Sequence, residues 1–128
     1  MNFVIWHDLG DARQAAPADS GVLQARARAP RPYPTGKSAM IFYGASGPED
    51  TLKSCVATGA GAAALDRART LGATLVRFGV TATPGEDLAR LLRGFAERFG
   101  ALPAANDPSD DDVPHVSPSS KNGAPRNV

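Results

Sequence analysis

Polar and apolar residues alternate along one stretch near the start of the chain, and a second stretch is mainly apolar. From Val22 to Arg28, leucine and alanines share one face, while glutamine and arginines share the other. A period of two is typical of a strand with one buried face. Ala39 to Tyr43 forms the apolar second run. We expect these two strands to pair as antiparallel neighbours, because consecutive elements usually lie side by side.

The segment between the two predicted strands, residues 29–38, contains three prolines and a glycine. Proline has no backbone N–H to donate to a sheet ladder, so this composition predicts a loop. The loop contains Thr35-Gly36-Lys37-Ser38, which imitates the end of a phosphate-binding P-loop. A P-loop opens a helix, whereas this segment leads into a strand, so nucleotide binding is not predicted here.

Two helices and a third strand are predicted in the middle of the chain. Ser46-Gly47-Pro48-Glu49 fits a capping box, and a short helix with Leu52, Cys55 and Val56 on one stripe follows it. Ala62 to Leu71 has the pattern of a second helix, which Gly72 ends. Thr74 to Thr81 alternates again and predicts the third strand.

The strongest helical pattern lies near the end. Thr83-Pro84-Gly85-Glu86 combines a capping box with proline at the first helical position. Gly100 marks the end of this helix. Its apolar residues recur at helical spacing and form one continuous stripe: Leu88, Leu91, Leu92, Phe95 and Phe99.

These elements predict an α+β domain over residues 21–106. Its core is a small three-stranded antiparallel sheet, with elements in the order ββααβα and helices flanking it. Residues 1–20 form an N-terminal extension, and the pattern leaves open whether it docks on the core. Residues 107–128 are rich in proline, serine and aspartate, which predicts a disordered acidic and polar tail. The aspartate run Asp110–Asp112 is interpreted as solvated.

Composition narrows the functional classes only slightly. The formal net charge is +1, with twelve basic and nine acidic side chains in residues 1–106. Such a balance permits nucleic-acid binding without requiring it. Cys55 is the single cysteine, so an intramolecular disulfide and a thiolate metal cluster are excluded, and a reducing cytoplasm is the expected location. No segment approaches the roughly twenty apolar residues of a membrane helix, so no membrane partner is expected.

Three short motifs stand in an order that resembles a known family. Gly21-Val22-Leu23 lies on the first predicted strand and Phe42-Tyr43-Gly44 on the second, while the last helix leads into Leu102-Pro103-Ala104-Ala105-Asn106. In this order they resemble the GIY-YIG domain, the fold of a family of nucleic-acid-cutting enzymes. The resemblance implies a three-stranded antiparallel sheet surrounded by helices. It also implies a site in which tyrosines and an arginine surround a phosphate and a glutamate holds one divalent metal.

The chain departs from the family pattern at the positions that carry chemistry. Leu23 stands at the first tyrosine position and Phe42 at the second, with Tyr43 one residue later. On a strand, that shift sends the hydroxyl to the opposite face. Lys53 is the only cation on the helix after Ser46, and lysine cannot form the bidentate fork of an arginine. Glu86 stands on the last helix, where it is also explained as a cap residue.

The first hypothesis is a GIY-YIG-like domain with a degenerate active site, which associates with nucleic acid, or acts in a mobile-element setting, with little or no cleavage. DNA or RNA would contact cations of the first hairpin and the third strand: Arg26, Arg28, Arg31, Lys37 and Arg77. The same cations are explained equally well as solvating an exposed sheet face. Phosphate contacts of this kind give salt-sensitive binding that does not depend on sequence.

Two alternatives stay open. The first is a non-catalytic protein-interaction or inhibitor module, whose partner would be another protein. The second is a weak metal-dependent endonuclease acting on a phosphodiester, which would use Tyr43 (or Tyr33), Lys53 and Glu86 as catalytic residues. Glu86 would then hold Mg or Mn; no cofactor is expected otherwise.

Overall fold

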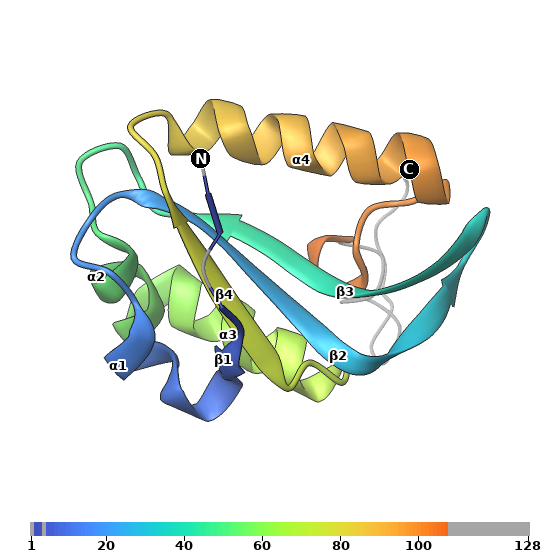
Figure 1. The fold of residues 1–128 in the computed structure, drawn as a ribbon, viewed down its shortest axis with the longest axis horizontal. Helices are drawn as coiled ribbons and strands as arrows, with labels where there is room; N and C mark the ends of the chain where they lie inside the picture. The colour runs from blue at the N-terminus through green and yellow to red at the C-terminus, as the bar shows by residue number, and fades with distance from the viewer. Residues whose placement is uncertain (1, 4, 108–128) are drawn as a thin grey trace, which may run out of the picture.

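A computed structural model describes residues 2–3 and 5–107, in which helices cover both faces of a sheet (Figure 1). The elements run β1 (His7–Asp8), η1 (Leu9–Asp11), α1 (Ala12–Ala15), β2 (Gly21–Tyr33), β3 (Gly36–Ala45), α2 (Leu52–Ala57), α3 (Gly59–Thr70), β4 (Leu75–Val80), α4 (Pro84–Phe99) and η2 (Ala104–Asn106). None of the helices within these residues is long and apolar enough to cross a membrane.

The sheet is antiparallel, with β2 between its two long neighbours. Its strand order is β1-β4-β2-β3. Leu23 lies opposite Gly44 of β3 and opposite Phe78 of β4. The predicted antiparallel hairpin, the third strand and the α+β class are therefore confirmed.

The predicted count of three strands and the order ββααβα are incomplete. A fourth strand, β1, pairs with β4, so that His7 lies opposite Val76, and η1 and α1 also precede β2. Leu9, Ala12 and Ala16 are buried in the core. The segment from Leu9 to Ala16 therefore contributes to the core. The elements within residues 1–20 are two to four residues long, too short for a periodic pattern to show them.

The prediction of a loop over residues 29–38 is wrong. Strand β2 continues to Tyr33 and β3 begins at Gly36, so only two residues form the turn. Strand β4 pairs with β2 only as far as Arg26, and the β2–β3 register is irregular between Arg26 and Arg31. Pro30 and Pro32 thus lie where β2 has lost one neighbour and part of its ladder, which is where a strand tolerates proline, and Pro34 lies in the turn.

Both helix starts differ from their predicted capping boxes. Thr51, rather than Ser46, caps α2 by accepting a hydrogen bond from the Ser54 N–H. Ser46 is buried, and its hydroxyl oxygen accepts from the Gly21 N–H at 3.0 Å, which ties the end of β3 to the start of β2. At α4, Thr83 makes no side-chain cap bond, although the predicted end is confirmed by Gly100 in the left-handed conformation.

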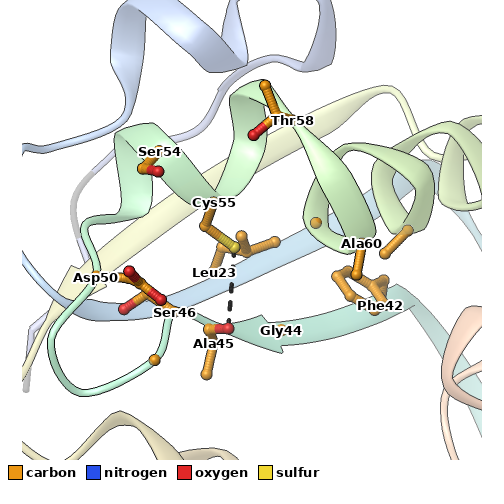
Figure 2. Close-up of a pocket in the computed structure, with 13 residues that line it drawn as sticks. Leu23, Phe42, Gly44, Ala45, Ser46, Asp50, Ser54, Cys55, Thr58 and Ala60 are labelled. Atoms are coloured by element: carbon orange, nitrogen blue, oxygen red, sulfur yellow. Dashed lines mark hydrogen bonds between the residues drawn. The ribbon is translucent and has the colours of Figure 1, made fainter.

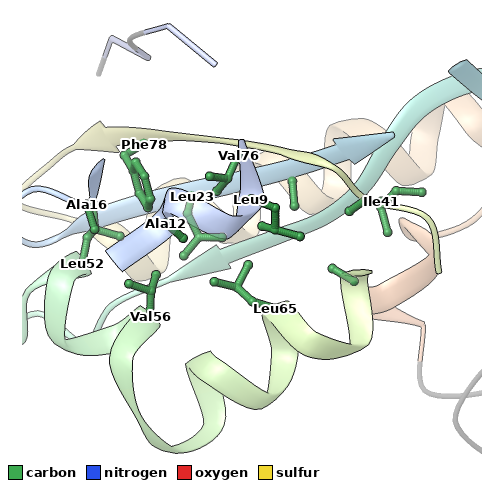
Figure 3. Packing of buried hydrophobic residues seen from close by; sticks show 13 residues of the cluster. Leu9, Ala12, Ala16, Leu23, Ile41, Leu52, Val56, Leu65, Val76 and Phe78 are labelled. Atoms are coloured by element: carbon green, nitrogen blue, oxygen red, sulfur yellow. The ribbon is translucent and has the colours of Figure 1, made fainter. Parts of the chain in front are cut away.

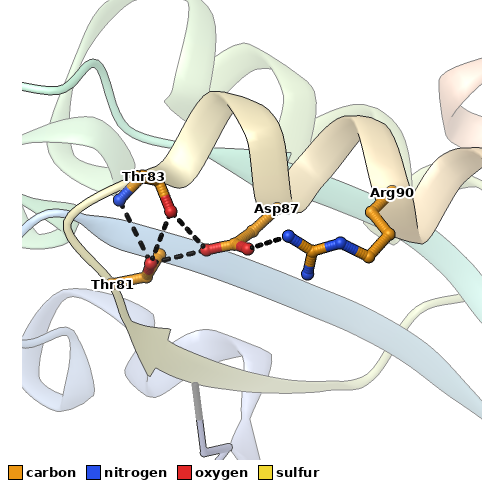
Figure 4. A network of polar contacts seen from close by, with 4 residues as sticks. All are labelled: Thr81, Thr83, Asp87 and Arg90. Carbon is orange, nitrogen blue, oxygen red and sulfur yellow. Dashed lines mark hydrogen bonds and ion pairs between the residues drawn. The ribbon is translucent and has the colours of Figure 1, made fainter.

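The carboxylate that organises the start of α4 is that of Asp87 rather than that of Glu86. Asp87 is buried and accepts hydrogen bonds from the hydroxyls of Thr81 and Thr83 (Figure 4). Arg90, one turn later, forms an ion pair with it at 2.9 Å. This network attaches the end of β4 to the first turn of α4.

The two faces of the sheet have different cores. One face packs against α1, α2 and α3 through an apolar cluster that includes Leu23, Val56 and Phe78 (Figure 3). The other face lies beneath α4 (Figure 1), where the ring of Phe95 contacts those of Tyr33 and Tyr43. Any side chain on β2, β3 or β4 is assigned to one of these faces by its position along the strand.

Candidate functional site

A cavity of about 420 Å³ opens between the end of β3 and helices α2 and α3 (Figure 2). Leu23 and Phe42 form part of its wall from the sheet, and Cys55 and Ala60 line it from the helices. The remaining lining residues are Gly44, Ala45, Ser46, Gly47, Asp50, Ser54, Thr58, Gly61 and Ala64.

Two glycines set the shape of this pocket. A Cβ on Gly44 would lie 2.7 Å from the ring of Phe42. A Cβ on Gly61 would lie 1.9 Å from the carbonyl oxygen of Cys55. The missing side chains therefore let Phe42 lie over β3 and let α3 approach α2 closely.

The pocket is lined mainly by apolar and neutral polar side chains. Its thirteen lining residues include no lysine or arginine, and Asp50 is the one residue among them with a formal charge at neutral pH. Burial, and secondly the charge of Asp50, raise the pKa of the Cys55 thiol. Cys55 is therefore a neutral thiol at neutral pH, and it contacts the carbonyl oxygen of Ala45 at 3.9 Å. A neutral thiol is a poor nucleophile.

Leu23 and Phe42, at the tyrosine positions of the sequence resemblance, meet in this one pocket. Tyr43 is on the other face, where its ring lies 5.9 Å from that of Phe95 and it is only 8% exposed. Burial raises the pKa of Tyr43, against a smaller opposing effect of Arg77. Its phenol is thus neutral at neutral pH.

The three predicted catalytic residues do not line this pocket. Lys53 is exposed on α2, across the sheet from Tyr43, and its ammonium group donates to the carbonyl of Arg13 at 2.9 Å. Glu86 is exposed in the first turn of α4, and its carboxylate makes no hydrogen bond or ion pair within residues 2–3 and 5–107. Tyr33 uses its hydroxyl structurally, donating to the Met40 carbonyl at 2.7 Å.

No group of three or more histidine, cysteine, aspartate or glutamate side chains in the described part of the chain is arranged to hold a metal. The aspartates of the predicted tail, Asp110–Asp112, lie outside the described residues.

A second polar surface lies on the α4 face of the sheet. Gln24 is opposite Tyr43 on β3 and opposite Arg77 on β4, so the three side chains share a face. The Arg77 Nε donates to the Gln24 side-chain oxygen at 2.7 Å. Arg26, two residues after Gln24, projects from the same side of β2.

The guanidinium groups of Arg26 and Arg77 both stack on Trp6. Their central carbons lie 4.4 and 4.5 Å from the centroid of its ring, and that of Arg77 is also 4.9 Å from the Phe3 ring. We define these two side chains as the arginine pair. The sequence pattern suggested Arg26 and Arg77 but missed Trp6. Trp6 is about twenty residues from Arg26 and about seventy from Arg77 along the chain, so no local pattern links them.

The other three predicted nucleic-acid contacts lie on the β2–β3 hairpin. Arg28 and Lys37 are exposed. Arg31 lies over the ring of Tyr33, 5.7 Å from its centroid. The five predicted cations therefore separate into the half-buried arginine pair and three hairpin cations, of which Arg28 and Lys37 are exposed and Arg31 is half-buried.

Asn106, the asparagine of the sequence resemblance, has a structural role. Its side-chain oxygen accepts from the Tyr43 N–H at 2.9 Å, and its side-chain nitrogen donates to the Tyr43 carbonyl at 2.8 Å. The amide thus continues the hydrogen-bond ladder at the outer edge of β3.

No family model, no curated protein and no solved structure matches this chain. Function is therefore inferred from the chemistry of the pocket and of the arginine surfaces.

Proposed function

We propose that the chain is a GIY-YIG-like domain with a degenerate active site, which associates with nucleic acid and cleaves it little or not at all. The observation that supports the loss of cleavage most directly is the meeting of Leu23 and Phe42 in a pocket without lysine or arginine. In the family that this chain resembles, tyrosines and an arginine surround the scissile phosphate at the corresponding place.

The pocket is unsuited to the transition state of phosphodiester cleavage. That state gathers negative charge, which an enzyme stabilises with cations or oriented donors. Here Leu23 and Phe42 offer no hydroxyl, and the carboxylate of Asp50 would repel the phosphate. Lys53 is engaged with the Arg13 carbonyl and does not line the pocket.

The association with nucleic acid is supported by the hairpin cations and by the arginine pair. Arg28 and Lys37 are exposed on β2 and β3, and the half-buried Arg31 lies between them along the chain. Contacts between such groups and phosphates release counterions, so binding weakens as salt rises and depends little on base sequence.

The first test is a plasmid-nicking assay with Mg²⁺ or Mn²⁺, comparing the natural chain with Glu86→Ala. We expect no nicking by either protein above a buffer control. Metal-dependent nicking that Glu86→Ala abolishes would instead establish the weak endonuclease.

The second test is a titration of labelled DNA and RNA at two salt concentrations. We expect binding at low salt that weakens steeply at higher salt. Binding that is absent even at low salt would remove the nucleic-acid function.

A protein-interaction module is the second candidate, and two observations favour it. The pocket has mostly carbon walls and could accept an apolar side chain of a partner. Ile5 and Val80 are large apolar residues that are 73% and 49% exposed. This candidate would stand if the nucleic-acid titrations are negative.

A further inference from the structure

We propose that Arg26 and Arg77, stacked on Trp6, form a binding site for one phosphate group of a nucleic-acid strand. This inference rests on the proposed function and deepens it, because it assigns the point at which a strand is anchored. The site lies on the α4 face of the sheet, whereas the pocket lined by Leu23 and Phe42 is on the opposite face.

Strand register and the Trp6 ring bring the two guanidinium groups to one place on the sheet. Gln24 lies directly opposite Arg77 on the neighbouring strand, and Arg26 lies opposite Leu75, so the two arginines are diagonal neighbours on one face. Both groups lie within 4.5 Å of the same indole centroid. A stacked guanidinium keeps the N–H donors along its edge free for an acceptor, because the ring contacts its face.

Among the described residues, no carboxylate neutralises the charges of the pair, because none forms an ion pair with Arg26 or Arg77. Two cations side by side repel each other, and burial followed by the charge of Arg26 lowers the pKa of Arg77. A bound anion would remove this repulsion.

One buried donor in the site has no acceptor among the described residues. The Nε of Arg26 is inaccessible to solvent and makes no hydrogen bond with the described residues. Buried polar groups without a partner are rare in proteins. Water does not reach the Arg26 Nε, so a phosphate would bind through the terminal nitrogens of the guanidinium. In contrast, the equivalent atom of Arg77 is satisfied by Gln24. The fork of a guanidinium matches the spacing of phosphate oxygens.

The surroundings favour a nucleic-acid strand as the source of the phosphate. Arg28 follows Arg26 by two residues on β2, and Arg31, further along the same strand, lies over the ring of Tyr33. Positive charge therefore continues from the pair onto the hairpin, as a polyanion would require. An acidic peptide is the alternative ligand for two arginines, and titration with such a peptide distinguishes it from a nucleic-acid strand.

Trp6 provides a direct measurement, because it is the single tryptophan of the chain. The full chain would be titrated at constant ionic strength with sodium phosphate, with chloride, with a short oligothymidylate and with an acidic peptide, following tryptophan fluorescence. We expect saturable changes with phosphate and with the oligonucleotide, and none with chloride or the peptide.

Glutamine variants distinguish binding by the arginine pair from attraction to the overall positive charge of the domain. Arg26→Gln and Arg77→Gln should each weaken the binding of both ligands by about 10- to 100-fold. Each should also reduce the salt slope of oligonucleotide binding by about 1. Arg93→Gln, an exposed change on α4, is the matched control and should leave both quantities unchanged.

Lysine variants protect the test against a folding defect. Arg26→Lys and Arg77→Lys keep the charge and the aliphatic stem but lose the fork. They should preserve the salt slope and the thermal unfolding midpoint while phosphate binding weakens.

Three results would overturn the proposal. The first is fluorescence that responds to phosphate no more than to chloride. The second is oligonucleotide binding that is unchanged in both glutamine variants, which would leave the proposed function intact and remove only this site. The third is binding of phosphate or of the acidic peptide without binding of the oligonucleotide, which would remove the proposed function as well.

Discussion

At the residue scale, the glycines of the two motif tripeptides are explained by packing. A Cβ on Gly21 would lie 2.2 Å from the backbone oxygen of Gly79, and one on Gly44 would lie 2.7 Å from the Phe42 ring. At Gly21 the neighbouring backbone leaves no room for a side chain, and at Gly44 a side chain would displace the Phe42 ring. Packing thus explains the glycines of the two tripeptides without any role in phosphate chemistry. Leu23 and Phe42, in the same tripeptides, carry no polar group that could contact a phosphate.

The structural role of the Asn106 side chain can be tested by a single substitution. Asn106→Ala removes both hydrogen bonds to the backbone of Tyr43, and we expect it to lower the free energy of unfolding by about 1–3 kcal/mol. Urea denaturation measures this quantity. Asn2→Ala, at an exposed position, is the control. A loss below about 0.5 kcal/mol, the usual range for surface changes, would show that solvent replaces the amide at the edge of β3.

At the scale of elements, α4 is positioned by a network that sequence reasoning assigned to another residue. The predicted capping box pointed to Glu86, whereas the buried carboxylate of Asp87 binds Thr81 and Thr83 (Figure 4). Thr81 lies at the end of β4, so its hydroxyl reaches Asp87 only because the connection folds back tightly. A capping pattern counts positions within the helix and cannot include such a contact.

The Asp87 network predicts a dependence of stability on pH. Its hydrogen bond from Thr81 above all, and then those from Arg90 and Thr83, lower the pKa of Asp87 in the folded state. The unfolded value is about 3.9. The ionised carboxylate therefore stabilises the fold fully above about pH 5, and this stabilisation is lost as the pH falls through the folded pKa.

We therefore expect the stability difference between the natural chain and Asp87→Asn to be largest near pH 7 and to shrink toward pH 3. Urea unfolding at a series of pH values measures it. Glu86→Gln, an exposed change in the same turn, should alter the stability at pH 7 by less than about 0.5 kcal/mol. A difference for Asp87→Asn that stays constant with pH would contradict the role given to its charge.

At the scale of the whole molecule, the N-terminal segment completes both the sheet and the core. Strand β1 extends the sheet beyond β4, and Leu9, Ala12 and Ala16 fill the cluster beneath it (Figure 3). The backbone N–H of Leu9 also donates to the Thr74 carbonyl at 2.9 Å. The folded unit therefore begins well before the residues that resemble a family.

This arrangement predicts different effects for two apolar residues of one segment. Leu9 is 4% exposed, so Leu9→Ala should lower the free energy of unfolding by about 2–5 kcal/mol. Ile5 is 73% exposed, so Ile5→Ala should change it by less than about 0.5 kcal/mol. Urea denaturation of the two variants gives both values. Equal effects would mean that the segment does not contribute to the core as described.

Secondary structure was predictable where the signal is local and long enough. The alternation of β4 and the apolar stripe of α4 repeat over several residues, and burial of one face enforces each pattern. Strand β1 has two residues, and α1 has four, so neither contains a full period. The prolines of residues 29–38 indicated a loop because the partner strands, and where their pairing stops, are not visible locally.

The sequence by itself determined the hairpin, the third strand, the final helix and the absence of tyrosine at positions 23 and 42, because these depend on residue type and short-range periodicity. Only the tertiary structure decided that Leu23 and Phe42 share a pocket, that Tyr43 lies beneath α4, and that Arg26 and Arg77 stack on Trp6. The physical reason is that strand register and helix packing join segments far apart in the chain, and a one-residue shift in register moves a side chain to the other face.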